Sequence, residues 1–238
     1  MHTTELDPMS SQALSHGNRD GFKLVIGSKN YSSWSMRPWV VMKAFNIPFQ
    51  EILVHLGQPD TSANIAQYSA AGRVPVLLAG ETSVWDSLAI CEYLAEQFPE
   101  RNLWPHDVRS RAIARSICAE MHSGFNGLRS AMWMNIRARF PGKGRTPEAQ
   151  ADIGRISEIW ETCFSRSNPH QFLFGGFSIA DAYFAPVAMR FRTYGVALGP
   201  ALDAYVERVV AHPAVAHWID DALKENIHME LYDVYPDA

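Results

Sequence analysis

The sequence predicts an α/β domain followed by an all-α domain, and three observations support this prediction. Strand-like and helix-like segments alternate between residues 22 and 98. After Pro99 the composition changes, and every periodic segment has helical spacing. The chain of 238 residues is long enough for two small domains that each bury a core. We therefore expect an α/β domain over residues 22–100 and an all-helical domain over residues 107–230.

Residues 1–21 are polar and show no periodicity. The ends of a chain are ordered only where they are tied to the rest of the molecule. We expect this segment to be a flexible leader outside the fold.

The α/β domain is expected to contain four strands and three helices. A β-prone run at residues 22–27 is followed by a serine-rich loop and a helix that reaches Asn46. This helix must begin near Ser33–Ser35, because Pro38 is tolerated only in the first turn. Proline cannot donate in a ladder, so Pro75 marks the start or the edge of the strand at 73–78. The other expected elements are strands at 49–55 and 82–85 and helices at 61–68 and 86–98.

The segment from Asn102 to Pro105 is a candidate linker to the helical domain. The first helix beyond it is predicted to be long, over residues 108–139, with Gly124 and Gly127 weakening or bending its middle. A loop rich in Pro, Gly and Lys follows at 141–147. Further helices are predicted at 148–165, 179–194, 201–210 and 214–227.

Composition excludes several classes of protein. The 21 basic and 25 acidic residues give a net charge of −4, and the basic residues are scattered, which does not suit a nucleic-acid partner. No apolar run approaches the roughly 18 residues of a membrane span, so no membrane partner is expected. Cys91, Cys118 and Cys163 fit neither a disulfide framework nor a metal site, and the histidines form no i,i+4 pair. We expect a cytoplasmic protein with buried thiols and no metal.

A cluster of serines lies between the first strand and the first helix, at Ser32, Ser33 and Ser35. The first backbone N–H groups of a helix lack partners, and the helix dipole favours an anion there. A hydroxyl at this place can cap the helix, or it can donate a hydrogen bond to a thiolate held in front of it. Both interpretations stay open. Asp86 and Ser87 form a second junction of this kind, so two helix N-termini of the domain point toward anions.

A capping box is predicted at the start of the helix at 179–194. Ser178 is followed three positions later by Asp181, with Phe177 and Ala182 placed to form a hydrophobic staple. We expect a structural role, and loss of such a cap costs about 0.5–2 kcal/mol of stability.

Met121, Phe125, Arg129 and Trp133 form a stripe at helical spacing on the predicted long helix, beside His122. A stripe of Met and aromatic residues is typical of a helix packed in a core. It also lines apolar pockets between domains. The core is the more usual place for such a stripe, and the pocket stays open as the alternative.

In this order and spacing, the motifs resemble those of glutathione S-transferases, and the resemblance runs from Phe22 to about Leu223. It implies a thioredoxin-like N-terminal domain, a helical C-terminal domain, glutathione as co-substrate and a homodimer. Four motifs carry the resemblance. The stretch Ser32–Arg37 is similar to the serine-rich stretch of the zeta class, and Arg73–Pro75 is similar to the family's cis-proline motif. The other two are the pair Asp86-Ser87 and the box Ser178–Asp181.

The resemblance also implies roles for individual residues. It implies that Ser32 activates the glutathione thiol with help from Ser33, that Val74 and Pro75 hold the cysteinyl unit through the backbone, and that Asp86 and Ser87 hold the γ-glutamyl end. Met121, Phe125 and Arg129 would line the pocket for a small hydrophobic electrophile.

Trp34 stands where the zeta class usually has Cys. Tyr31, just before the serines, makes a tyrosine-type mechanism the second choice. The leading prediction is a glutathione transferase. A glutathione-dependent isomerase of the maleylacetoacetate or maleylpyruvate type, and a non-catalytic glutathione-binding member of the fold, are the alternatives.

Simple energetics support activation by a hydroxyl. A free thiol with a pKa of about 8.5 is only about 3% thiolate at pH 7. Lowering that pKa by about two units requires roughly 2.7 kcal/mol of selective stabilisation. One hydrogen bond to a charged partner supplies about 1.5–3 kcal/mol, and a helix N-terminus adds about 0.3–1 kcal/mol. A serine at a helix start is therefore sufficient without a metal or a general base.

Overall fold

The computed structural model describes residues 21–168, 170–233 and 235. The predicted leader at 1–21 lies outside the described residues, except for Gly21.

A four-stranded mixed sheet forms the first half of the molecule, with the strand order β2-β1-β3-β4. The central strand β1 (Lys23–Gly27) runs parallel to β2 (Gln50–Val54) and antiparallel to β3 (Val76–Ala79). A tight turn joins β3 to the edge strand β4 (Thr82–Trp85). This is the thioredoxin-like arrangement that the resemblance implies.

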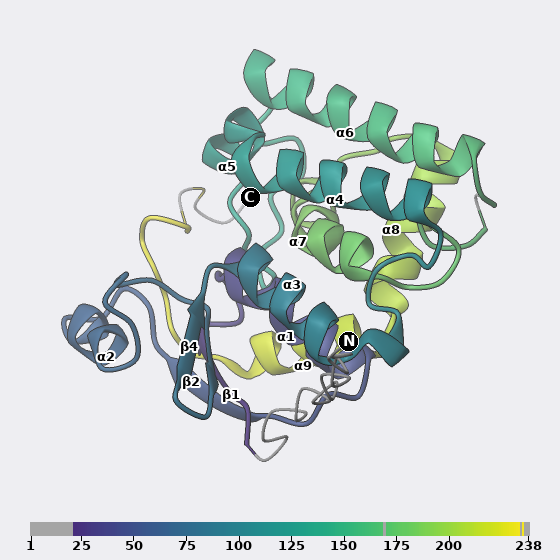
Figure 1. Ribbon diagram of the computed structural model, residues 1–238. Helices are drawn as coiled ribbons and strands as arrows, with labels where there is room; N and C mark the ends of the chain where they lie inside the picture. The colour runs from purple at the N-terminus through teal and green to yellow at the C-terminus, as the bar shows by residue number, and fades with distance from the viewer. Residues whose placement is uncertain (1–20, 169, 234, 236–238) are drawn as a thin grey trace, which may run out of the picture.

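Alternate side chains of β1 enter two separate apolar clusters, because successive residues of a strand point to opposite faces. Leu24 and Ile26 belong to the main core, which α1 (Ser33–Ala44) and α3 (Ser87–Gln97) share. Val25 faces the smaller cluster, which includes Ile65 of α2 (Thr61–Ala66). The sheet therefore has helices on both faces, as Figure 1 shows for α1 and α3 on one side and α2 apart from them.

Strand β3 begins at Val76, three residues after the predicted start at Arg73. Pro75 therefore precedes the strand, as a residue that cannot donate in a ladder should. The peptide bond between Val74 and Pro75 is cis, in agreement with the motif.

The second half of the chain is helical among the described residues. Helix α7 lies at its centre and is buried along almost its whole length. The other helices gather around it (Figure 1). The elements are the short 3-10 turn Pro99–Arg101 and the helices α4 (Val108–Ser123), α5 (Asn126–Ala131), α6 (Pro147–Ser165), α7 (Ile179–Tyr194), α8 (Pro200–Ala211) and α9 (Pro213–Lys224).

The prediction of one long helix at 108–139 is wrong. Helix α4 ends at Ser123, because Gly124 is extended and Phe125 adopts a left-handed conformation with φ of 60°. The chain turns there into α5, and residues 132–146 are not helical. Gly127 is needed at this turn, since a Cβ on it would lie 2.6 Å from the backbone carbon of Glu148.

The capping box at the start of α7 is confirmed. Ser178 and Asp181 exchange the two reciprocal hydrogen bonds of the motif. Asp181 is fully buried, and it also accepts hydrogen bonds from the Leu173 N–H at 3.1 Å and the Tyr205 hydroxyl at 3.0 Å. The box therefore does more than begin a helix, because it ties α8 and the segment before α7 to one carboxylate.

Helix α9 returns to the α/β half and packs against α1 (Figure 1). The rings of Trp218 and Trp39 meet edge to face at 5.2 Å between centroids. The Trp218 indole N–H donates to the Lys29 carbonyl at 3.0 Å, and the Lys29 ammonium pairs with Asp221 at 2.7 Å. These contacts fix the loop after β1, on which the candidate site lies.

Candidate functional site

Ser32 caps helix α1 with its side chain. Its hydroxyl donates to the hydroxyl of Ser35 at 2.7 Å and accepts weakly from the Ser35 N–H at 3.4 Å. The Ser35 hydroxyl in turn accepts from the Gly27 N–H at 3.0 Å. The hydrogen of the Ser32 hydroxyl is thus given to Ser35. Activation of a thiolate requires the two hydroxyls to reverse, so that Ser35 donates to Ser32 and Ser32 donates to the ligand.

Ser33 is buried and lies beside an arginine of the central helix. Its hydroxyl accepts a long hydrogen bond from Nη2 of Arg190 at 3.4 Å. This bond uses only the oxygen of Ser33, so the hydroxyl hydrogen of Ser33 stays available to donate into the site.

The hydroxyl of Tyr31 is already bound to the C-terminal segment. It lies 3.0 and 3.1 Å from the two carboxylate oxygens of Asp233, and it accepts from the Met229 N–H at 3.3 Å and from Arg137 at 3.3 Å. Burial is the main cause of a raised pKa for this phenol. These contacts disfavour the tyrosine-type mechanism.

Asp86 and Ser87 start helix α3 as the sequence predicts. One carboxylate oxygen of Asp86 accepts from the N–H groups of Leu88 at 2.8 Å and Ala89 at 3.4 Å. The other lies 3.3 Å from Nε2 of His122, whose pKa is lowered mainly by burial. Asp86 has φ of 76°, a strained conformation for a residue with a Cβ and one that is frequent at functional sites.

Ser87 is buried, and its hydroxyl is 2.9 Å from the hydroxyl of Tyr183 on α7. Its side chain therefore ties α3 to α7. The residue can still offer its backbone N–H at the helix start, where an anion is favoured.

Two neighbouring pockets connect these junctions. A pocket of about 470 Å³ includes the Asp86 junction, and another of about 380 Å³ includes the serines. Trp34, Arg73 and Val74 line both, so the two pockets adjoin. The first is also lined by Ala71, Pro75, Trp85, Asp86, Ser87 and His122, and the second by Tyr31, Ser32, Ser33, Leu56, Ile65, Gly72, Arg129, Trp133, Arg190 and Tyr232.

The structure thus brings together the residues predicted to touch glutathione. For the predicted electrophile pocket the placement is mixed. Arg129 lines the pocket that contains Ser32, whereas Met121 and Phe125 lie in the core and line neither of the two pockets. The core interpretation that the stripe left open describes their position.

Two charged or aromatic residues that line the pocket of the serines, Arg190 and Tyr232, were not singled out from the sequence. Arg190 had a signal, since it is a charged residue within a helix whose neighbours are almost all apolar and buried. Tyr232 had no such signal, because it lies in the C-terminal segment, which reaches the pocket only through the fold.

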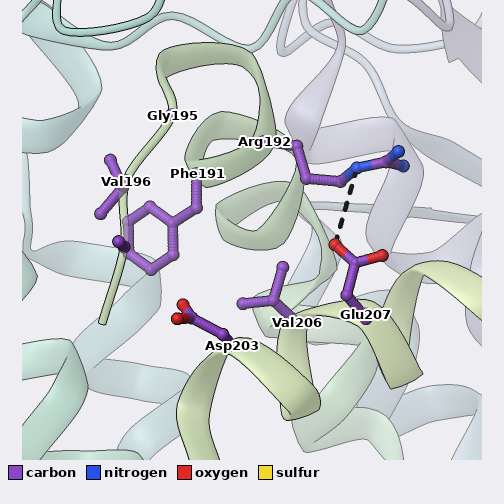
Figure 2. Close-up of a pocket in the computed structure, with 8 residues that line it drawn as sticks. Phe191, Arg192, Gly195, Val196, Asp203, Val206 and Glu207 are labelled. Atoms are coloured by element: carbon purple, nitrogen blue, oxygen red, sulfur yellow. Dashed lines mark ion pairs between the residues drawn. The ribbon is translucent and has the colours of Figure 1, made fainter. Parts of the chain in front are cut away.

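A further hollow of about 380 Å³ lies between α7 and the start of α8 (Figure 2). Its lining includes Arg192, which lies 4.0 Å from Glu207, and it shares no residue with the two pockets above. Its position away from both helix N-termini gives it no part in the chemistry of the serines.

All three cysteines are free and buried, and burial raises the pKa of each thiol, for Cys163 to about 11. Within the described ranges, no group of three or more His, Cys, Asp or Glu side chains is placed to hold a metal ion. No helix in the described part of the chain has the length and apolarity needed to cross a membrane.

Comparisons with known proteins agree with this geometry. The family model described as "Glutathione S-transferase, N-terminal domain" matches residues 31–97, and "Glutathione S-transferase, C-terminal domain" matches residues 120–221. The two matches cover both halves of the fold, and the chain belongs to the glutathione S-transferase family.

Individual relatives are distant. The chain is 30% identical to glutathione S-transferase 1 of Dianthus caryophyllus over 100 residues, which is 42% of this chain and 45% of that protein. It is 26% identical to maleylacetoacetate isomerase of Rattus norvegicus over 169 residues, covering 71% and 77% of the two chains. A crystal structure of a glutathione transferase homologue from Burkholderia with bound glutathione superposes with a TM-score of 0.67 at 26% identity, covering 85% of this chain and 98% of the other.

The matched segments span about half the length of the first curated relatives, 45% of the Dianthus protein and 50% of a probable maleylacetoacetate isomerase of Caenorhabditis elegans. The longer matches, to the Rattus protein and to the Burkholderia structure, cover most of this chain.

Proposed function

We propose that the protein is a glutathione transferase that uses the hydroxyl of Ser32 to stabilise the glutathione thiolate for attack on a small electrophile. The observation that supports this most strongly is the joining of two helix N-termini, at Ser32 and at Asp86-Ser87, by two adjoining pockets. The bound glutathione of the Burkholderia homologue supports the choice of ligand.

The γ-glutamyl end and the cysteinyl unit of glutathione each have a suitable place in this arrangement. The γ-glutamyl carboxylate would accept from the Ser87 N–H at the start of α3, and its ammonium group would lie against the Asp86 carboxylate. Val74 would pair through its backbone with the cysteinyl unit, with Pro75 and Trp34 beside it. The thiol would then lie in the pocket that contains the serines.

The serine chain supplies the stabilisation of the thiolate. The Gly27 N–H donates to the Ser35 hydroxyl at 3.0 Å, and the Ser35 and Ser32 hydroxyls lie 2.7 Å apart. With a thiolate bound, Ser35 would donate to Ser32 and Ser32 to the sulfur, and such chains strengthen the last donor. The neutral hydroxyl donates to the thiolate and is not itself the nucleophile. The thiol proton passes to solvent, and the sulfur attacks the electrophile.

The walls of the second pocket suit a small planar electrophile. Trp34, Trp133, Tyr31 and Tyr232 provide aromatic surface beside the serines. Trp34 takes the place of the zeta-class Cys, so no second thiol lies at that position.

We propose a cytoplasmic homodimer with the domain limits 22–100 and 107–230, on the strength of the family resemblance.

Two measurements test the function. Calorimetric titration with glutathione and with S-methylglutathione should show binding of both, because the contacts of the γ-glutamyl end do not involve the thiol. Turnover of glutathione with chlorodinitrobenzene should then exceed the uncatalysed rate, and Ser116→Ala on the exposed face of α4 should match the wild type.

The alternatives predict other outcomes. Binding of glutathione without turnover of an aryl halide, a maleyl substrate or a hydroperoxide would indicate a non-catalytic member of the fold. Turnover of the maleyl substrate alone would indicate the isomerase. No binding of glutathione would refute the proposal altogether.

A further inference from the structure

Three arginines from three different helices converge beside the serines. Arg37 of α1 and Arg129 of α5 lie over the ring of Trp34, with their guanidinium carbons 4.3 and 4.7 Å from its centroid. Arg190 of α7 contacts Ser33, and with Arg129 it lines the pocket that contains Ser32. Helix α1 packs against α7, and α5 lies beside α6 (Figure 1).

None of the three guanidinium groups forms an ion pair with a carboxylate in the part of the chain that the structure describes. All three guanidinium nitrogens of Arg37 are buried without a hydrogen-bond partner, and its charge is held against the rings of Trp34 and Tyr183. A buried charge without a counter-charge is costly, so this arrangement favours an anion.

The two arginines that line the pocket are held by backbone carbonyls. Arg190 donates to the carbonyls of Met132 at 2.8 Å and Pro186 at 3.3 Å. Arg129 donates to the carbonyls of Gly124 and Met121. These contacts orient the guanidinium groups while leaving their positive charge uncompensated.

The positively charged guanidinium groups repel one another, and this repulsion lowers their pKa values in addition to burial. Burial first and the neighbouring guanidinium groups second lower the pKa of Arg129 to about 10 and that of Arg190 to about 9. The carboxylate of Asp152 raises the pKa of Arg129 only slightly. It accepts a hydrogen bond from the Leu128 N–H at 2.8 Å. Arg129 and Arg190 therefore stay charged at pH 7, and these two positive groups line the pocket together with its aromatic side chains.

We propose that Arg129 and Arg190 bind a carboxylate on the electrophile, so that the enzyme prefers planar, carboxylate-bearing electrophiles to neutral ones of the same shape. This inference rests on the proposed function. A single thiolate held by Ser32 would balance one of the three positive charges, which leaves charge for a second anion. The planar guanidinium fork is also better matched to a carboxylate than to a sulfur atom.

The test compares a chlorodinitrobenzoate with its primary amide at saturating glutathione. In both reactions the thiolate forms a bond to the ring carbon, the carbon–chlorine bond breaks, and chloride leaves. Each kcat/KM is divided by the uncatalysed rate constant with glutathione, which removes the difference in intrinsic reactivity. We expect the wild-type ratio of benzoate to amide to be about tenfold or more, the value of one hydrogen bond to a charged partner.

Arg129→Met and Arg190→Met should each lower this ratio by about tenfold, and Arg190→Lys should restore part of it. Arg192→Met is the matched control, since Arg192 lies on the same helix as Arg190 but lines the hollow of Figure 2, and its ratio should equal that of the wild type. The wild-type ratio is informative by itself if an arginine variant does not fold.

Two results would overturn the inference. The first is a wild-type ratio at or below one in a protein that binds glutathione and turns over the amide. The second is an equal loss with both substrates in Arg129→Met and Arg190→Met together with a raised pKa of the bound thiol, since the arginines would then serve the thiolate. If titration shows no binding of glutathione, the proposed function fails at an earlier and separate step.

Discussion

Replacing Asp181 with alanine removes one carboxylate that accepts from four buried donors. Three are the backbone N–H groups of Leu173 and Ser178 and the hydroxyl of Tyr205, at 3.1, 2.9 and 3.0 Å. The fourth is the Ser178 hydroxyl at 3.1 Å, which is left out of the sum because it can rotate toward another acceptor. An orphaned buried donor costs about 1–3 kcal/mol, so the gross loss is about 3–9 kcal/mol. Removing a buried carboxylate returns part of this, because burial raises the pKa of Asp181 to about 6 and two pKa units correspond to about 3 kcal/mol.

The expected net loss is therefore roughly 3 kcal/mol at pH 7, which is more than the 0.5–2 kcal/mol of a helix cap alone. Urea unfolding of Asp181→Ala at one protein concentration measures it. Ser178→Ala is the matched control, because it removes the cap hydroxyl but leaves the carboxylate with its other donors. Activity per folded molecule should be largely kept.

The loss of unfolding free energy in Asp181→Ala should also depend on pH. The raised pKa means that the folded protein holds the Asp181 proton at a pH where the unfolded chain has released it. This stabilisation is complete below the unfolded value of about 3.9 and is lost as the pH rises through about 6. The loss in Asp181→Ala should therefore be larger at pH 5 than at pH 7, by about 1 kcal/mol. A loss equal to that of Ser178→Ala at both values would refute the reasoning.

Three further substitutions probe the glutathione site. Asp86→Ala should weaken glutathione binding more than it slows the reaction of the bound state, and an unchanged affinity in calorimetric titration would contradict its place at the amine. Ser33→Ala should change the pKa of the bound thiol less than Ser32→Ala does, as followed by thiolate absorbance; a larger change would exchange the two roles. Ser35→Ala should raise the pKa of the bound thiol by an amount between those of Ser33→Ala and Ser32→Ala. It should also lower the midpoint of thermal unfolding, because the Gly27 N–H loses its partner. A thiol pKa equal to that of the wild type would show that Ser35 takes no part in the chain of hydroxyls.

Local patterns were sufficient for most elements of the fold. The start of α1 followed from Pro38, and the capping box at Ser178 placed α7 to the residue. The break after Ser123 could not be predicted in the same way. It depends on a left-handed Phe125 and on the close approach of Gly127 to α6, and both are tertiary features that helical spacing does not encode.

The glutathione half of the site was more predictable than the electrophile half. Ser32 and Asp86 lie at helix starts, where local chemistry constrains the residue type. The second pocket is assembled from α5, α7 and the C-terminal segment, which meet only through long-range packing. Arg190 could be noticed as a charge in an apolar helix, but its neighbours Arg37 and Arg129 are 153 and 61 positions away in the sequence.

The most direct test of the proposed mechanism is the ultraviolet absorbance of the thiolate of bound glutathione, titrated against pH for the wild type, Ser32→Ala and the control Ser116→Ala. We expect a wild-type thiol pKa about two units below the free value, as a hydroxyl at a helix start can supply. Ser32→Ala should move it back toward about 8.5 with glutathione still bound, and turnover lost at neutral pH should partly return at higher pH. A titration that Ser32→Ala leaves unmoved, while Ser33→Ala or Tyr31→Phe shifts it, would contradict the assignment of the activating hydroxyl.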